Sequence, residues 1–151
     1  MKNKLFLVML LLMILEIPFS CGIYTLEGTL NAPYNISRST EILRFYGDNN
    51  ESYFAGYNIW YKESEIESYQ LAYYIKNGVS SIKPTIKKSD AIYDGSGPNE
   101  VSLKDLYPQY SNDNFYTINQ NDSNKKFYFA VSAYGENGEE SEKVEFPRWP
   151  N

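Results

Sequence analysis

The sequence contains no histidine and only one cysteine, Cys21, among its 151 residues. Without histidine, the chain lacks the commonest general base, the usual partner of Ser and Cys nucleophiles, and the commonest zinc ligand. A single cysteine cannot form an intramolecular disulfide, so a hydrophobic core has to hold the fold. We therefore expect no enzymatic activity, no metal site and no cofactor.

Positive charge is also scarce, because 14 Lys and Arg stand against 19 Asp and Glu, for a formal net charge of −5. Lys2, Lys4 and Glu16 lie in the first 20 residues, which leaves 12 basic and 18 acidic side chains and a net charge of −6 beyond them. An acidic surface repels phosphate backbones, so we expect no nucleic-acid partner.

Residues 1–20 have the layout of a secretory signal peptide. A short cationic segment, 1–4, precedes an apolar run, 5–15, and Cys21 follows Ser20 directly. The run is shorter than the roughly 20 residues that a membrane-spanning helix needs. The alternatives are therefore a cleaved signal peptide with an incidental cysteine, an uncleaved anchor, or a site of lipid attachment.

The position of Cys21 resembles a bacterial lipobox of the looser, spirochaete-like kind, in which Pro18 stands where leucine is usual. This resemblance implies removal of residues 1–20, a lipid on Cys21 and a tether over 21–29. It also implies anchoring to a bacterial membrane in the cell envelope, and we expect the outer membrane or cell surface rather than the inner membrane.

Beyond residue 30, apolar and polar residues alternate in short segments separated by turn signals, a pattern typical of a β-sandwich or barrel. In residues 56–62, Tyr57, Ile59 and Tyr61 face one side, and residues 127–134 alternate in the same way. The expected strands are 30–37, 41–46, 56–62, 69–76, 115–118, 127–134 and 143–146. Residues 79–112 show no clear pattern and form a functional loop, an ordered excursion, or a region with an unassigned strand.

Two stretches resemble a fibronectin type III domain: Gly-Tyr-Asn-Ile-Trp-Tyr at 56–61 is similar to its strand C, and 127–141 to its strands F and G with their turn. The resemblance implies an all-β, fibronectin type III or immunoglobulin-like antiparallel β-sandwich of about seven strands. It covers residues 30–147, with an insert at 79–112 before the penultimate strands and a tail at 148–151. Phe127 replaces the family's usual corner tyrosine and Phe45 its usual tryptophan, and both replacements are apolar.

Trp60 and Tyr128 are the main candidate binding residues. They fall on neighbouring strands with their side chains outward, and Tyr73 or Tyr74 extends the patch, depending on register. Amphipathic aromatic side chains on an exposed sheet commonly anchor a partner. The alternative is that residues 79–112 fold over this face and bury it.

Acidic residues gather in three places. Residues 48–51, and Asp90, Asp94 and Glu100, offer oxygen ligands for calcium, but neither set matches the twelve-residue calcium loop, so we expect solvated turn residues. Glutamates in 136–142 lie on a convex hairpin turn, whereas glycosidase chemistry requires a cleft.

These patterns predict a non-enzymatic, membrane-anchored envelope lipoprotein whose β-sandwich is an adhesion-type module for a protein or carbohydrate ligand. The alternative is a structural spacer or envelope assembly subunit with no ligand of its own. An exposed patch at Trp60 and Tyr128 favours the first of these functions.

Overall fold

The structure is a computed structural model that describes residues 29–76, 78–81, 83–122 and 124–148. It consists mostly of strands in antiparallel sheets, consistent with the expected all-β sandwich. The expected leader and nearly all of the expected tether lie outside the described residues.

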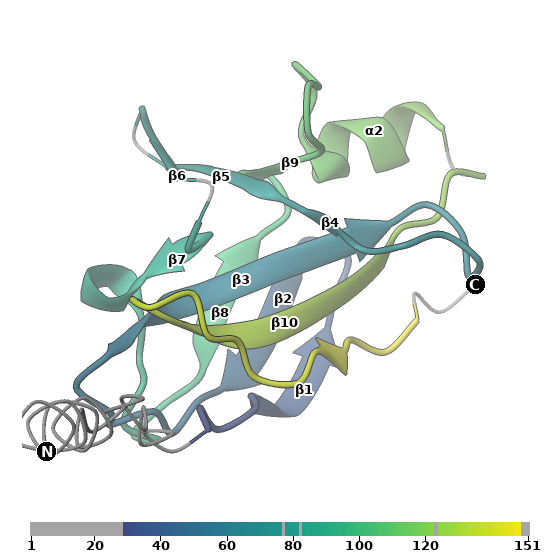
Figure 1. Ribbon diagram of the computed structural model, residues 1–151. Coiled ribbons are helices and arrows are strands. Elements are labelled where there is room, and N and C mark those ends of the chain that lie inside the picture. Colours follow the sequence, from purple (N-terminus) through teal and green to yellow (C-terminus); the bar gives the residue numbers. More distant parts are fainter. Residues whose placement is uncertain (1–28, 77, 82, 123, 149–151) are drawn as a thin grey trace, which may run out of the picture.

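Two sheets form the main body. The first contains β1 (Tyr34–Arg38), β2 (Ile42–Tyr46) and β8 (Asn99–Ser102) in the order β1-β2-β8. The second has the order β11-β10-β3-β4 and contains β3 (Phe54–Lys62), β4 (Gln70–Leu71), β10 (Tyr128–Gly135) and β11 (Val144–Glu145). The short strand β7 (Ile86–Lys87) also pairs with β3. Figure 1 shows β3 and β10 in front of β1, β2 and β8.

The core lies between these two sheets and confirms the period-two pattern. Leu43 and Phe45 of β2 are fully buried, and the Phe45 ring meets the Tyr57 ring edge-on with 5.0 Å between centroids. The expected inward rows of the second sheet are buried as well: Tyr57, Ile59, Tyr61, Phe127, Phe129, Val131 and Ala133. Burying a large apolar side chain contributes roughly 1.5–3 kcal/mol, so these rows account for a fold without a disulfide.

The described residues of 79–112 contain short strands that the sequence pattern did not assign, and one of these strands belongs to the first sheet. That strand, β8, pairs with β2 and belongs to the first sheet, so 79–112 is not wholly an insert. The additional structure is a third sheet of order β6-β5-β9, made of β6 (Val79–Ser81), β5 (Tyr73–Lys76) and β9 (Leu106–Tyr107). A single 3-10 turn, η1 (Lys88–Asp90), follows β7.

The prediction of a strand at 115–118 was wrong, because this segment begins the helix α2 (Phe115–Asn121). Asn114 caps the helix: its side-chain oxygen accepts a hydrogen bond from the Thr117 amide at 2.8 Å. Phe115 is fully buried, with its ring 4.9 Å from that of Tyr61 and 4.8 Å from that of Phe127. One buried ring and one cap therefore decide the structure of this segment.

The prediction of one strand over 69–76 was also wrong. β4 pairs with β3, with Leu71 opposite Trp60, whereas β5 pairs with β6 and β9. The division falls at Ala72, which is fully buried and donates its amide hydrogen to the Ile59 carbonyl at 2.9 Å. The chain leaves the second sheet at this point and continues into the third.

Candidate functional site

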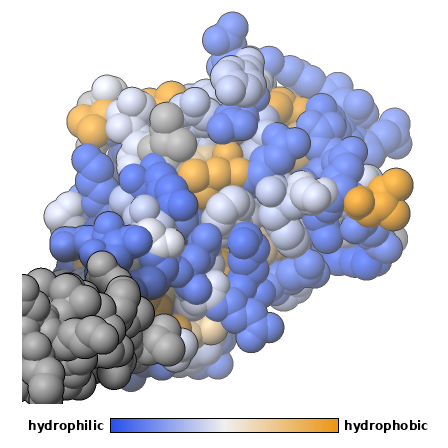
Figure 2. All heavy atoms as spheres, viewed as in Figure 1, coloured by the Kyte–Doolittle hydropathy of each residue, from blue (hydrophilic) through white to orange (hydrophobic). Residues whose placement is uncertain are grey.

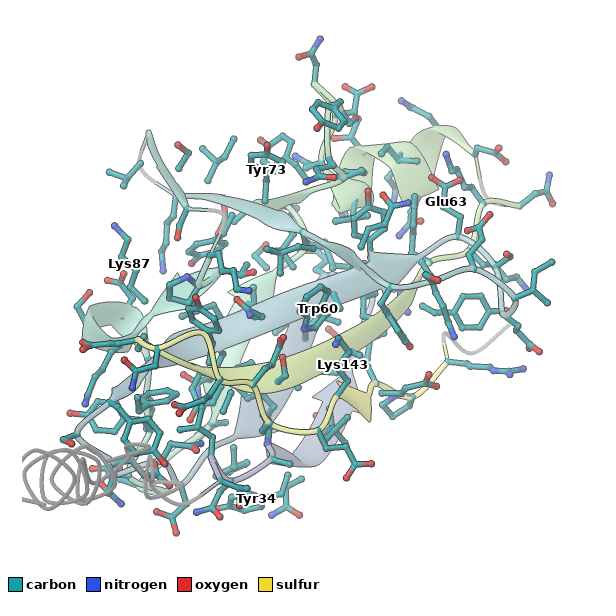
Figure 3. All side chains as sticks on the ribbon, viewed as in Figure 1. Tyr34, Trp60, Glu63, Tyr73, Lys87 and Lys143 are labelled. Atoms are coloured by element: carbon teal, nitrogen blue, oxygen red, sulfur yellow. The ribbon has the colours of Figure 1, made fainter. Side chains whose placement is uncertain are left out.

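Trp60 lies on the outer side of β3, the side facing away from the core. It is half-buried, and its indole N–H donates a hydrogen bond to the Ser132 hydroxyl oxygen on β10 at 2.8 Å. The Lys143 ammonium group lies 4.1 Å from the centre of the ring, within the range of a cation–π interaction. Figure 3 shows Trp60 and Lys143 close together on this side of the sheet. The hydrogen bond to Ser132 and the contact with Lys143 therefore hold the indole in one orientation.

A polar network beneath Trp60 provides that orientation. Asn58 and Ser132 are fully buried, although both point to the outer side of the sheet. The Ser132 hydroxyl donates to Glu140 Oε1, and the Asn58 amide donates to the same oxygen at 3.1 Å. The Thr85 amide hydrogen in turn bonds to the Asn58 side-chain oxygen at 3.3 Å. The network joins β3, β10, the segment before β11 and the segment before β7.

Tyr128 lies at one end of the same face and is half-buried between two cations. The Lys62 ammonium group is 5.7 Å from the centre of its ring, and the Arg148 guanidinium carbon is 5.5 Å from it. Lys62 is also 4.6 Å from the Tyr69 ring and 3.6 Å from a Glu145 carboxylate oxygen. One lysine therefore contacts two aromatic rings and one carboxylate.

Tyr69 closes this end of the face. Its hydroxyl donates to Glu145 Oε1 at 2.7 Å, which links the start of β4 to β11. Burial raises the pKa of Tyr69, and the hydrogen bond to Glu145 raises it further because both favour the neutral phenol. Tyr69 therefore keeps its proton, and its donor role, at neutral pH.

At the opposite end of the face, the Lys83 ammonium group lies 4.6 Å from the centre of the Tyr134 ring. The outer aromatic face is defined here as four rings and the four cations that contact them: Trp60, Tyr69, Tyr128, Tyr134, Lys62, Lys83, Lys143 and Arg148. Such a face offers flat apolar contact area together with four cations, of which Lys62 and Arg148 are also paired with Glu145 and Glu65. It suits a ligand with apolar surfaces and anionic groups. Figure 2 shows this side of the molecule as mainly hydrophilic, with separate hydrophobic areas.

The structure brings Trp60 and Tyr128 together on one face, but it does not add Tyr73 or Tyr74 to them. Trp60 pairs with Ala130 and Tyr128 with Lys62, so the two aromatic residues are diagonal neighbours. Tyr73 and Tyr74 are on β5, where they pair with Tyr107 and Leu106 of β9. The expected extension of the patch is therefore wrong, because the chain leaves the second sheet at Ala72.

Sequence reasoning overlooked the cations and the supporting network. Lys62, Lys143 and Arg148 come from three separate segments, and no local pattern relates them. Asn58 and Ser132 were a sequence sign of the supporting network. Polar residues in the middle of two neighbouring apolar strands indicate either an exposed sheet surface or a buried hydrogen bond.

In the part of the chain that the structure describes, no group of three His, Cys, Asp or Glu residues is placed to hold a metal ion. Glu100 makes an ion pair with Arg44 instead. Asn49, expected to be a solvated turn residue, is fully buried, and its side-chain amide donates to the Tyr57 hydroxyl at 3.4 Å. The turn at 48–51 therefore packs against the core.

Cys21, the candidate lipidation site, lies outside the described residues. Within the described ranges, the structure contains no helix with both the length and the apolar character needed to cross a membrane.

A scan against protein-family models found no match to this chain, and neither did searches of curated proteins and of solved structures.

Proposed function

We propose that this chain is a non-enzymatic lipoprotein of a bacterial cell envelope, held by a lipid on Cys21, whose β-sandwich binds a protein or carbohydrate ligand. The outer aromatic face is the binding surface, and its composition is the observation that carries the proposal. The core is already filled by the inner rows of both sheets, so the four outer rings are not needed to complete it. Four cations gather on these rings in a chain whose net charge is −5.

The strand order supports a fibronectin type III-like sandwich. The stretches that resemble strands C, F and G correspond to β3, β10 and β11, which are neighbours in one sheet in that order, as in sandwiches of this class. β1, β2 and β8 form the opposing sheet. The sandwich presents the C-F-G surface outward and the third sheet beside it.

The geometry of Trp60 favours binding because the indole is held in place before a ligand arrives. A side chain that is already ordered loses less conformational entropy on binding. A ligand that stacks on the exposed part of the ring displaces the Lys143 ammonium group, whose interaction at such a site is worth about 0.5–1 kcal/mol. The displaced cation remains near enough to pair with an anionic group of the ligand.

Alanine variants of the two aromatic candidates test this function. Full-length wild type, Trp60→Ala and Tyr128→Ala are compared for binding to an immobilised panel of purified polysaccharides and surface proteins. Tyr110→Ala is the matched control, since Tyr110 is 93% exposed on the loop after β9. We expect at least one panel member to bind wild type and control equally and each face variant about tenfold more weakly or worse. Equal binding by all four proteins contradicts the proposal, provided that circular dichroism shows each to be folded.

A structural spacer with no ligand is the second candidate, and one observation favours it. The Trp60 N–H and one face of its ring are already satisfied by Ser132 and Lys143. In that case Trp60→Ala lowers the free energy of unfolding without changing the binding of any panel member.

A further inference from the structure

A groove separate from the outer aromatic face lies between the third sheet and β7. It has a volume of about 270 Å³. Tyr74, Lys76 and Val79 line it from the β5–β6 hairpin, and Thr85 and Lys87 line it from the β7 side. Figure 3 labels Lys87 between β7 and this hairpin. The volume is at the lower end of the range for small-molecule sites, so the groove suits a single compact unit.

The groove lies in a locally basic part of an acidic protein. Residues 76–88 contain four lysines and no Asp or Glu, whereas the chain has a net charge of −5. Two of the four have partners: Lys83 on the Tyr134 ring and Lys88 on the Tyr93 ring at 5.1 Å. An isolated region of positive potential on a negative surface attracts and orients anions.

Lys76 and Lys87 are the two lysines that line the groove, and they stand on its opposite walls. Within the described ranges neither makes an ion pair, a side-chain hydrogen bond or a ring contact. Both are exposed. Their six N–H donors are therefore available to one anionic group held between the walls.

Asp90 restricts the class of ligand because it lines the same groove. Its carboxylate repels a polyanion but accepts hydrogen bonds from hydroxyl groups. The half-buried Tyr74 ring and the Val79 side chain, which is 62% exposed, add apolar contact surface. The combination suits a ligand with one negative charge, several hydroxyl donors and an apolar face.

We propose that this groove binds a carboxylate-bearing sugar unit of the uronic acid type. Lys76 and Lys87 hold the sugar carboxylate, Asp90 accepts hydrogen bonds from ring hydroxyls, and Tyr74 packs against the face of the ring. This inference extends the proposed binding function to a second surface, whose lysines, Lys76 and Lys87, are not part of the outer aromatic face.

Calorimetric titration of the full-length protein at low salt tests the proposal with four probes: glucuronate, galacturonate, glucose and inorganic phosphate. We expect the two uronates to bind, glucose to bind at least about tenfold more weakly for lack of the charge, and phosphate to compete poorly because of Asp90. Lys76→Gln and Lys87→Gln each weaken uronate binding about fivefold or more. Lys126→Gln, which removes the same charge from an exposed lysine elsewhere, leaves it unchanged.

Two further variants distinguish the proposed site from a simple anion site and from the outer aromatic face. Asp90→Ala is expected to weaken uronate binding and strengthen phosphate binding, which a simple anion site does not predict. Trp60→Ala leaves uronate affinity unchanged, so loss of ligand at the outer aromatic face and loss at the groove are distinguishable. Absence of uronate binding, equal affinity for glucose or phosphate, or wild-type affinity in both lysine variants overturns the proposal.

Discussion

At the scale of single residues, the outer aromatic face depends on a small number of buried hydrogen bonds. Ser132 both accepts from the Trp60 N–H and donates to Glu140, so it couples the indole to the segment before β11. A hydroxyl with two partners in a buried position is difficult to replace, because its loss leaves a donor and an acceptor unsatisfied. Ser132 therefore contributes to stability and to the geometry of the proposed binding surface at once.

Ser132→Ala is expected to lower the free energy of unfolding by about 1–3 kcal/mol, the cost of leaving buried polar groups without partners. Urea denaturation followed by circular dichroism measures this change. Ser89→Ala is the control, because Ser89 is exposed and a surface substitution changes stability by about 0.5 kcal/mol or less. Equal stability of the two variants contradicts a structural role for the network.

Tyr57 makes stability dependent on pH in the alkaline range. Burial raises the pKa of Tyr57 to about 12, and the hydrogen bond from Asn49 offsets this only in part. Between pH 10 and 12 the unfolded chain loses the phenolic proton while the folded chain keeps it, so the free energy of unfolding falls as pH rises. One tyrosine contributes at most about 1.4 kcal/mol per pH unit to this slope.

Tyr57→Phe removes that contribution. We expect its free energy of unfolding to fall less steeply than that of wild type between pH 10 and 12, and in parallel with wild type between pH 7 and 9. Urea denaturation at intervals of half a pH unit gives both slopes. Ser89→Ala, at an exposed position without a titratable group, retains the wild-type slope. Identical slopes for wild type and Tyr57→Phe contradict the raised pKa.

At the scale of elements, the position of β7 depends on a glycine in β3. Gly56 has φ +148°, and a Cβ atom there would lie 2.0 Å from the Ile86 carbonyl oxygen. The absence of a side chain lets the β7 backbone pair with β3, and Thr85, which precedes β7, then reaches the Asn58 side chain. The pairing of β7 with β3 therefore positions residues of both the groove and the polar network.

Gly56→Ala should displace β7 and lower the free energy of unfolding by more than about 1 kcal/mol, since both the backbone conformation and the space are incompatible with a methyl group. Gly97→Ala is the matched control, because its Cβ atom meets only Ile92 Cδ1 at an ordinary 3.6 Å. Thermal denaturation compares the two variants, and hydrogen exchange at the β7 amides reports the local effect. Normal amide protection of β7 in Gly56→Ala is the contrary result.

How far the sequence predicts an element depends on where the deciding interactions lie. β2, β3 and β10 were predictable, because alternating apolar residues over five to nine positions require one buried face. Both α2 and β8 were missed, because each is short and depends on tertiary contacts. The aromatic cluster around Phe115 stabilises α2, and pairing with β2 stabilises β8. Only the Asn114 cap was a local sign of the helix.

The candidate site was likewise predictable only in part. Trp60 and Tyr128 were predictable as outward-facing neighbours, since strand alternation and hairpin order determine both. Their cations were not, because Lys62, Lys143 and Arg148 meet the rings only in the folded chain. The departure of Tyr73 and Tyr74 into another sheet likewise follows from pairing with β9, which lies about thirty residues away in the sequence.

At the scale of the whole molecule, the charge distribution is uneven. The sequence beyond residue 20 has a net charge of −6, but the outer aromatic face and the groove both collect lysines. Such a surface repels polyanions at long range, and the two proposed sites are the places where it would hold anionic groups. If the proposed membrane tether is present, this arrangement favours selective contacts over general adsorption.

Replacing Cys21 by serine tests the membrane anchor. Several acyl chains at about 0.8 kcal/mol per buried methylene hold a protein firmly on a membrane, and a serine hydroxyl at this position cannot form the thioether that links the lipid. In a bacterial host, we expect wild type to partition into the detergent phase on Triton X-114 extraction and to incorporate labelled palmitate. Cys21→Ser is expected to do neither. Mass spectrometry of the mature N-terminus identifies the modification directly.

The same pair of proteins separates the three interpretations of residues 1–21, because each depends differently on the thiol. An uncleaved apolar anchor keeps both proteins in the detergent phase, since residues 5–15 are unchanged by the substitution. An ordinary cleaved signal leaves both in the aqueous phase, because the remaining chain is acidic and polar. Only lipidation at Cys21 makes the partition depend on the sulfur atom of that residue. Equal partition of wild type and Cys21→Ser therefore contradicts the proposed anchor, and with it the proposed envelope location.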